Sequence, residues 1–230
     1  MRCSFAGSLQ AAAVVLGLGF GSVGANAATV TLTFGNQPGV FSPYTEAGYN
    51  VSANANGTGA VHLDNSNGQC PFADPACLHI SGDNPGTAFI ERQDGTKFDA
   101  LSFLINFSGE GSTNFVTFDN GVSSINLALG TSYTQGVYAG LAKTLVTGAV
   151  AKNTDYFIDL AKLAVANGKL STFFNNISEL SIETPSGGAN VRIDNVVLAA
   201  VPVPAAGLML LIGLGAFGGL AMKRRRHTTL

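Results

Sequence analysis

The chain has 230 residues, of which 46% are hydrophobic, and its 12 Lys and Arg against 14 Asp and Glu give a formal net charge of −2. Five of the basic residues are Arg2 and the cluster Lys223–Arg226, so the body between them sets seven basic residues against all 14 acidic ones. This balance argues against nucleic acid as a partner, because phosphate binding requires a positive patch.

The first 27 residues predict a signal peptide. Arg2 supplies a short positive region, Ala11–Phe20 forms an apolar stretch, and Ala25-Asn26-Ala27 fits the small-x-small site that signal peptidase reads. Cleavage after Ala27 leaves Ala28 as the first residue of the exported protein. The alternative is an uncleaved N-terminal anchor, which the short and glycine-interrupted apolar stretch disfavours.

Residues 28–200 predict one extracytoplasmic domain that is large enough to bury a core of its own. Short runs rich in β-branched and aromatic residues are separated by turn sequences such as Asn84-Pro85-Gly86 and Asn120-Gly121. About eleven strands at this spacing predict an all-β fold, an antiparallel β-sandwich of jelly-roll type. The predicted strands are Thr29–Phe34, Tyr49–Ser52, Ala60–Leu63, Leu78–Ile80, Ala88–Arg92, Phe98–Phe107, Asn114–Phe118, Ser124–Leu129, Tyr156–Leu160, Glu179–Glu183 and Asn190–Leu198.

One segment departs from the strand pattern. Asp159–Lys169 places Leu160, Leu163 and Ala164 at helical spacing and ends at Asn167-Gly168. Since this combination is typical of a helix that stops at a glycine, we expect one short helix here and no other in the body.

The two cysteines of the body, Cys70 and Cys77, predict a disulfide. An even pair at short spacing in an exported chain favours a bridge, which stabilises by roughly 2.5 kcal/mol for a loop of this length. The alternative is a metal site that combines the two cysteines with His62 and His79, but their spacing matches no zinc pattern.

The last thirty residues predict a membrane-targeting segment. An uncharged apolar stretch, residues 205–222, lies between Val201-Pro202-Val203-Pro204 and the cluster Lys223-Arg224-Arg225-Arg226. Eighteen helical residues rise about 27 Å, close to the roughly 30 Å hydrocarbon core of a bilayer. Because the cationic cluster stops translocation, the pattern predicts a transmembrane helix with a cytoplasmic C-terminus.

These three parts, in this order, resemble the PEP-CTERM sorting signal of Gram-negative bacteria in its VPLPA variant, with Val203 where that variant usually carries leucine. The resemblance covers residues 201–226 and implies that exosortase, an inner-membrane transpeptidase, is a partner. It also implies export through the inner membrane, transient or lasting anchoring there, and a final place at the cell surface or in an extracellular matrix of exopolysaccharide. The alternative is a single-pass anchor that is never cleaved.

The body resembles, more loosely, the galactose-binding-like jelly rolls of carbohydrate-binding modules, through Phe41–Tyr49 and Val191–Val196. The resemblance implies a structural Ca²⁺ held by an acidic residue early in the chain and an Asp of the last strand. Asp194 fits the second position, and Glu46 is the candidate for the first. The alternative is that Asp194 and Asn195 bond the backbone at a strand edge. No other cofactor is predicted.

Evidence for chemistry in the sequence is slight. His62 and His79 lie in no catalytic motif, and Asp94, Asp99 and Glu110 are carboxylates whose pairing the spacing does not fix. For glycan binding, the chain has no Trp and five Tyr, and tyrosines of a β-sandwich more often pack half-buried than form a sugar platform.

Taken together, the sequence predicts an exported, non-catalytic protein of the cell surface or extracellular matrix, associated with exopolysaccharide and biofilm. Two alternatives stay open. One is a glycan-binding module, which follows from the jelly-roll resemblance, and the other is a secreted hydrolase, which follows from the carboxylates.

Overall fold

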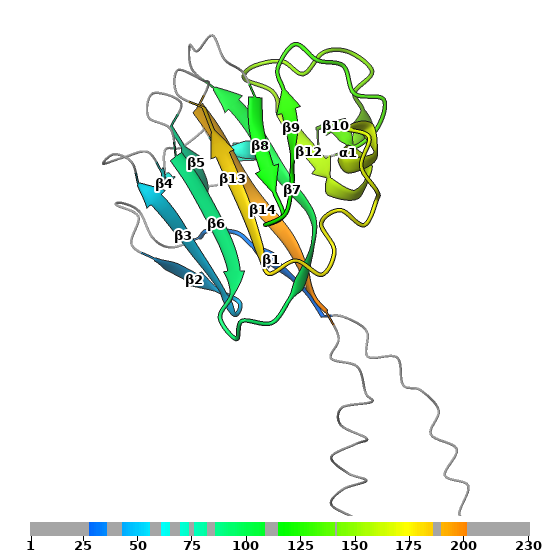
Figure 1. Cartoon of the computed structure of the whole chain (residues 1–230). Helices are drawn as coiled ribbons and strands as arrows, with labels where there is room; N and C mark the ends of the chain where they lie inside the picture. The colour runs from blue at the N-terminus through cyan, green and yellow to red at the C-terminus, as the bar shows by residue number, and fades with distance from the viewer. Residues whose placement is uncertain are drawn as a thin grey trace, which may run out of the picture.

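Strands of alternating burial pair into two sheets that face each other (Figure 1). The computed structural model describes residues 28–35, 43–55, 61–64, 70–73, 76–81, 86–108, 115–140, 142–185 and 190–201. Every strand pair in both sheets is antiparallel. The antiparallel β-sandwich with one short α-helix is therefore confirmed.

The first sheet, which we call sheet A, has eight strands in the order β11-β10-β12-β7-β14-β5-β4, with β1 also paired to β14. Their bounds are β1 Thr29–Leu32, β4 Val61–Asp64, β5 Cys77–Ile80, β7 Phe98–Ser108, β10 Val137–Ala139, β11 Thr144–Leu145, β12 Asp155–Asp159 and β14 Asn190–Ala200.

The second sheet, sheet B, has six strands in the order β2-β3-β6-β13-β8-β9. Their bounds are β2 Tyr44–Glu46, β3 Tyr49–Ala55, β6 Gly86–Arg92, β8 Phe115–Asp119, β9 Ser124–Ala128 and β13 Glu179–Thr184.

Strand β14 organises sheet A. One of its edges pairs with β7 from Asn190 to Ala200, while the other edge pairs first with β5 and then with β1. The register shifts between Asp194 and Val197, where Asn195 has a φ of 49°. This irregularity lets one strand serve two partners on the same side, as β-bulges do.

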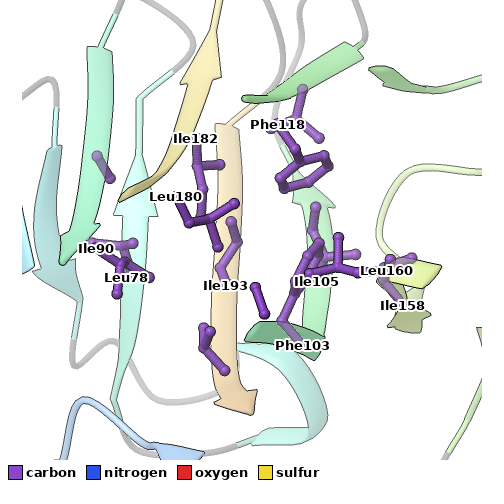
Figure 2. Packing of buried hydrophobic residues seen from close by; sticks show 14 of the residues in the cluster. Leu78, Ile90, Phe103, Ile105, Phe118, Ile158, Leu160, Leu180, Ile182 and Ile193 are labelled. Carbon is purple, nitrogen blue, oxygen red and sulfur yellow. The ribbon is translucent and has the colours of Figure 1, made fainter. Parts of the chain in front are cut away.

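The core lies between the two sheets and is built by alternation. In β7 and β14 every second residue points inward, so Ile105 and Ile193 are fully buried. Leu180 and Ile182 of β13 face them from sheet B, and Figure 2 shows these side chains gathered between the strands. Apolar burial of this kind is the main term that stabilises the fold.

The predicted helix forms as α1, Leu160–Ala166. Asp159 caps it, because its carboxylate accepts a hydrogen bond from Lys162 N at 3.0 Å. At the other end the chain turns at Gly168, which has a φ of +71°. Leu160, Leu163 and Ala164 are buried in the core, as the spacing predicted.

All eleven predicted strands fall on observed ones, with ends that differ by at most three residues. Strands β2, β10 and β11 were not predicted, because each has three residues or fewer and gives no alternation to detect. A short 3-10 turn, η1, at Pro71–Ala73 was also not predicted.

No helix among the described residues is long and apolar enough to cross a membrane. The predicted signal peptide, residues 1–27, and the predicted transmembrane segment, residues 205–222, lie outside the described residues.

Gly136, just before β10, tests the packing of α1. It has a φ of +89°, and a Cβ built on it would lie 2.4 Å from Leu163 N. We expect Gly136→Ala to lower the free energy of unfolding by about 2–4 kcal/mol, because a left-handed conformation and an overlap with backbone both add cost. Urea denaturation of the full chain measures the loss.

Gly140→Ala is the matched control. Gly140 also has a positive φ, +67°, but a Cβ there would meet nothing within 4 Å. Only the backbone cost of about 1–2 kcal/mol is expected. Equal losses in the two variants would contradict the packing of α1 against Gly136.

Candidate functional site

The outer face of sheet A, turned away from the core, carries a row of polar side chains. The register aligns them across five neighbouring strands, one from each strand. From β12 to β4 this polar row is Asp155, Asn106, Arg192, His79 and His62.

The loop closed by the predicted disulfide lies over the polar row. Cys70 and Cys77 are bonded, which confirms the prediction. Within this loop Phe72 N donates to Asp155 Oδ2 at 2.8 Å, and Asn106 Nδ2 donates to Asp155 Oδ1 at 2.6 Å. Arg192 beneath is only 4% exposed, and its guanidinium donates to Ser108 Oγ. The polar row is therefore an internal, covered network for much of its length.

The two histidines belong to this network. His79 Nδ1 lies 2.8 Å from His62 Nε2, and His79 is only 8% exposed. The alternative of a metal site that joins them to Cys70 and Cys77 does not form, because the two sulfurs are bonded to each other.

A second row on the same face is apolar and aromatic. On β7 and β12 it lies two residues from the polar row, and it continues across β10 and β11. We call its members, Leu104, Phe157, Tyr138 and Leu145, the aromatic row. Leu104, Phe157 and Tyr138 are half-buried, and Leu145 is 41% exposed. The centroids of the Tyr138 and Phe157 rings are 6.0 Å apart. This row has no buried member, whereas Arg192 and His79 of the polar row are buried.

Two lysines lie at the aromatic row. Lys143, in the turn between β10 and β11, places its Nζ 3.7 Å from the centroid of the Phe157 ring. Lys162, in the first turn of α1, donates from Nζ to the Tyr138 hydroxyl at 2.7 Å and lies 3.7 Å from Asp159 Oδ2. The hydrogen bond to Tyr138 is the main cause that raises the pKa of Lys162. The Lys162 ammonium is therefore charged at neutral pH.

Polar groups flank the aromatic row on both sides. Asn106 lies two residues after Leu104 on β7, and Asp155 and Asp159 lie two residues before and after Phe157 on β12. Aromatic faces with donors and acceptors beside them can bind a ligand that is apolar on one surface and hydroxyl-rich at its rim.

The Glu46 carboxylate is a hydrogen-bond acceptor for neighbouring backbone and hydroxyl groups. Its carboxylate accepts hydrogen bonds from Thr33 N, Phe34 N, the Thr33 hydroxyl and the Tyr44 hydroxyl, at 3.0–3.2 Å. Burial and this carboxylate raise the pKa of Tyr44 to about 12. Glu46 thereby ties the start of sheet B to the end of β1.

Asp194 is fully buried at the irregularity of β14. Its carboxylate accepts from Asn195 N at 2.6 Å and from Asn195 Nδ2 at 3.2 Å. The N–H and O–H donors around Asp194 and Glu46 fit hydrogen bonding rather than a cation that needs six to eight oxygens. Among the described residues no group of three metal-binding side chains occurs. The calcium site stays a prediction.

The carboxylates considered for catalysis have other partners. Asp94 accepts a hydrogen bond from Thr96 N at 2.9 Å and pairs with Arg92 at 2.6 Å. The bonds from Thr96 and then the charge of Arg92 lower the pKa of Asp94. Asp99 accepts from Asn176 N at 2.7 Å. Glu110 lies outside the described residues. The structure thus assigns Asp94 and Asp99 to turns and loop contacts.

The outer face of sheet B is acidic. Glu91 and Glu179 are opposite each other in the register of β6 and β13, and Asp119 and Glu183 lie on the same face. Burial, a hydrogen bond with Glu91 and the charges of Glu91 and Asp119 raise the pKa of Glu179. The two sheets therefore present different chemistry to solvent.

The two ends of the domain leave it side by side. Ala200 N donates to Ala28 O at 3.3 Å, and Val201 N donates to Lys97 O at 3.3 Å. In Figure 1 this end of β1 and β14 lies at the bottom of the domain, and β10 and α1 lie above it on the right. Of the predicted processing residues, Ala28 and Val201 are described. The others, Ala25, Ala27, Pro202, Val203, Pro204 and Lys223–Arg226, lie outside the described residues.

No family model and no curated protein matches the chain. Among solved structures, a mutant of the family 29 carbohydrate-binding module CBM29-2 complexed with mannohexaose is 11% identical, with a TM-score of 0.37, over 75% of this chain and 92% of that one. CBM29_1, a family 29 carbohydrate-binding module from Piromyces equi, is 8% identical, with a TM-score of 0.35, over 76% and 91%.

The CBM22-1-GH10 modules of Clostridium thermocellum xylanase 10B, complexed with xylohexaose, are 14% identical, with a TM-score of 0.36, over 76% of this chain and 29% of that one. These identities and TM-scores are low, so the function proposed below rests on the side chains of this chain alone.

The aromatic row was missed at the level of sequence. Tyr138 was grouped with tyrosines expected to pack half-buried, and Tyr49, Tyr133 and Tyr156 are indeed buried. Tyr138 differs because it lies in the unpredicted strand β10, next to Phe157. A Tyr followed within five residues by a lysine in a Gly-rich turn is the only sequence signal, and it is weak.

The pair Glu91 and Glu179 gives a pH prediction. The pKa of Glu179 is raised above its ordinary value of 4.5, so the folded chain binds this proton more tightly than the unfolded chain does. The stabilisation is fully present below pH 4.5 and is lost as pH rises through the raised pKa. We expect Glu179→Gln to raise the melting temperature at neutral pH by about 1–2 °C, from about 0.5 kcal/mol of relieved repulsion.

Thermal melts at neutral pH and below pH 4.5 measure this effect. The gain should vanish at the lower pH, where the Glu179 carboxyl of the wild type is protonated and the repulsion is absent. Glu183→Gln is the control, since its register neighbours Thr87 and Thr117 are uncharged. A gain that is the same at both pH values would contradict the pairing.

Proposed function

We propose that this protein is an exported, non-catalytic glycan-binding domain that acts at the cell surface or in an exopolysaccharide matrix. Its binding surface is the aromatic row on the outer face of sheet A. Binding to polysaccharide at that location makes it an adhesive or structural component of the matrix. We further propose that the β-sandwich has the jelly-roll connectivity of galactose-binding-like modules.

The observation that carries the proposal is the pairing of two partly exposed aromatic rings with polar side chains on both sides. Tyr138 and Phe157 are neighbours in the register of β10 and β12, on a sheet face that holds them in place. A pyranose ring has an apolar C–H surface that stacks on such rings and hydroxyls at its rim that bond the flanking Asn106 or Asp159. Rigid strands position the site better than a loop would.

The predicted sorting signal supports the same function. In this proposal the signal peptide exports the domain, the sorting signal at residues 201–226 holds it at the inner membrane for an exosortase, and the chain leaves the fold at Val201. Ala28 and Val201 lie together at the bottom of the domain, and β10 lies above them, so a tether at this end does not cover β10. A domain held in this way is oriented to meet a polysaccharide.

The hydrolase alternative finds less support. Asp94 and Asp99 are engaged by neighbouring donors, and the histidines lie beneath or beside the disulfide loop. Glu91 and Glu179 are close enough to share a proton, but two carboxyls at that distance leave no space between them for a glycosidic bond.

The binding surface is tested by removing its rings. We expect Tyr138→Ala and Phe157→Ala each to weaken retention on polysaccharide at least fivefold, because a sugar loses about 1 kcal/mol or more of stacking on each ring. Affinity electrophoresis of the full chain in gels that contain cellulose derivatives, mannan, xylan, alginate or the producing strain's own exopolysaccharide measures retention.

Phe173→Ala is the matched control. Phe173 is also partly buried and also has a lysine, Lys169, over its ring at 5.7 Å, but it lies after α1 and outside the aromatic row. Its variant should bind like the wild type. If the wild type is retained by no polysaccharide, or the Phe173 variant loses binding as the row variants do, the proposal fails.

Processing of the signal peptide and of the sorting tail is tested by intact-mass analysis of the protein recovered from cells and from medium. We expect a chain that begins at Ala28 and ends near Pro204, with any added group visible as extra mass. A native protein that still carries Arg226 in the inner membrane would contradict sorting by exosortase.

A further inference from the structure

The aromatic row gathers positive charge in a domain that is otherwise acidic. Only seven basic residues stand against 14 acidic ones in the body. Two of them, Lys143 and Lys162, lie on adjacent rings of the row. Of the others, Arg92 is paired with Asp94, and Arg192 is buried. Lys143 and Lys162 thus place two ammonium groups against the rings that a ligand on the row meets.

Lys143 covers the ring that a sugar would use. Its Nζ lies 3.7 Å from the centroid of Phe157, and the residue is exposed in a surface turn. No carboxylate of the described residues lies within ion-pair distance of Lys143. A cation–π contact at an exposed site is weak, so a ligand can displace the ammonium at low cost. Among the described residues, no carboxylate is placed to pair with the displaced ammonium.

From this geometry we infer that the ligand is an anionic glycan, a polysaccharide of uronic acids whose carboxylate takes up Lys143 as its pyranose ring replaces the ammonium over Phe157. This inference rests on the proposed function and names its ligand class. In a uronic acid the carboxylate is attached directly to the ring, so stacking and charge pairing occur at one sugar unit. A neutral glycan displaces the same ammonium and offers it no partner.

The second lysine extends the same preference to the neighbouring ring. Lys162 Nζ lies 2.7 Å from the Tyr138 hydroxyl, and its only ion pair among the described residues is Asp159, at 3.7 Å. One ammonium per ring matches a polymer that carries one carboxylate per sugar. Asp159 reduces the charge at Tyr138, so Lys143 is expected to contribute the larger share of the selectivity.

The outer face of sheet B and the polar row of sheet A both disfavour the docking of a polyanion. The outer face of sheet B presents Glu91, Glu179, Glu183 and Asp119, which repel a carboxylate polymer. The polar row of sheet A lies largely beneath the disulfide loop. The β10–β12 side of sheet A is thus where an acidic chain meets favourable charge.

The test compares two hexasaccharides that differ only at C6, cellohexaose and the hexamer of β-1,4-linked glucuronic acid. Titration calorimetry uses the full chain in a detergent without a sugar headgroup. We expect the wild type to bind the glucuronate hexamer more tightly, with an affinity that falls as salt screens the charges. Lys143→Ala should weaken this binding about two- to fivefold. The same variant should strengthen binding of cellohexaose, because it uncovers the Phe157 ring.

Lys169→Ala is the control, since it removes the same charge from a lysine that covers Phe173 instead. It should change neither affinity. Equal binding of the two hexamers by the wild type, or a parallel loss of both in Lys143→Ala, overturns the anionic ligand. In that case a loss of binding in Tyr138→Ala and Phe157→Ala would still support glycan binding. A wild type that binds neither hexamer also overturns this inference, and the polysaccharide gels decide on glycan binding separately.

Discussion

The two-sided pairing of β14 is the constraint on which the rest of the structure depends. Its full length binds β7 on one edge, while its other edge is shared between β5 and β1. Since antiparallel register fixes which side chains stand opposite each other, the position of β14 sets the alignment of Asn106, Arg192 and His79 across the sheet. The irregularity at Asn195 separates the two partners and places Asp194 between them. A shift of one residue in this strand would turn Arg192, which lies on the outer face, toward the core.

The disulfide loop divides that outer face into a closed half and an open half. Over β14, β7 and β12 the loop covers the polar row, and its Phe72 amide binds Asp155. A buried guanidinium such as that of Arg192 is tolerated only where acceptors surround it, and Ser108 supplies one. Beyond the loop the face is not covered, so Phe157 and Tyr138 reach solvent. The disulfide therefore determines where a ligand has access as well as contributing to stability.

The long strands and α1 could be predicted because their signals are local. Leu160, Leu163 and Asn167-Gly168 mark the helix by spacing and capping, and the alternation of β7 and β14 is visible within one run of residues. Strands β10 and β11 could not be predicted in this way, since three residues carry no period. The candidate site depends on them. Tyr138 and Phe157 are far apart in the chain, and only the register of β10 with β12 brings them together. Long-range pairing of this kind leaves no trace in composition or spacing.

If the domain binds glycans as proposed, the position of Lys143 resolves a conflict that an exposed sugar site faces. A bare aromatic ring on the surface favours sugar stacking, yet it also favours nonspecific association before the ligand is reached. A lysine held over Phe157 by a weak contact covers the ring while the site is empty and yields when a suitable ligand arrives. Such a cover costs affinity for every ligand equally, unless the ligand supplies a charge for the ammonium. Selectivity for an anionic polymer then arises from the residue that protects the site, with no additional pocket required.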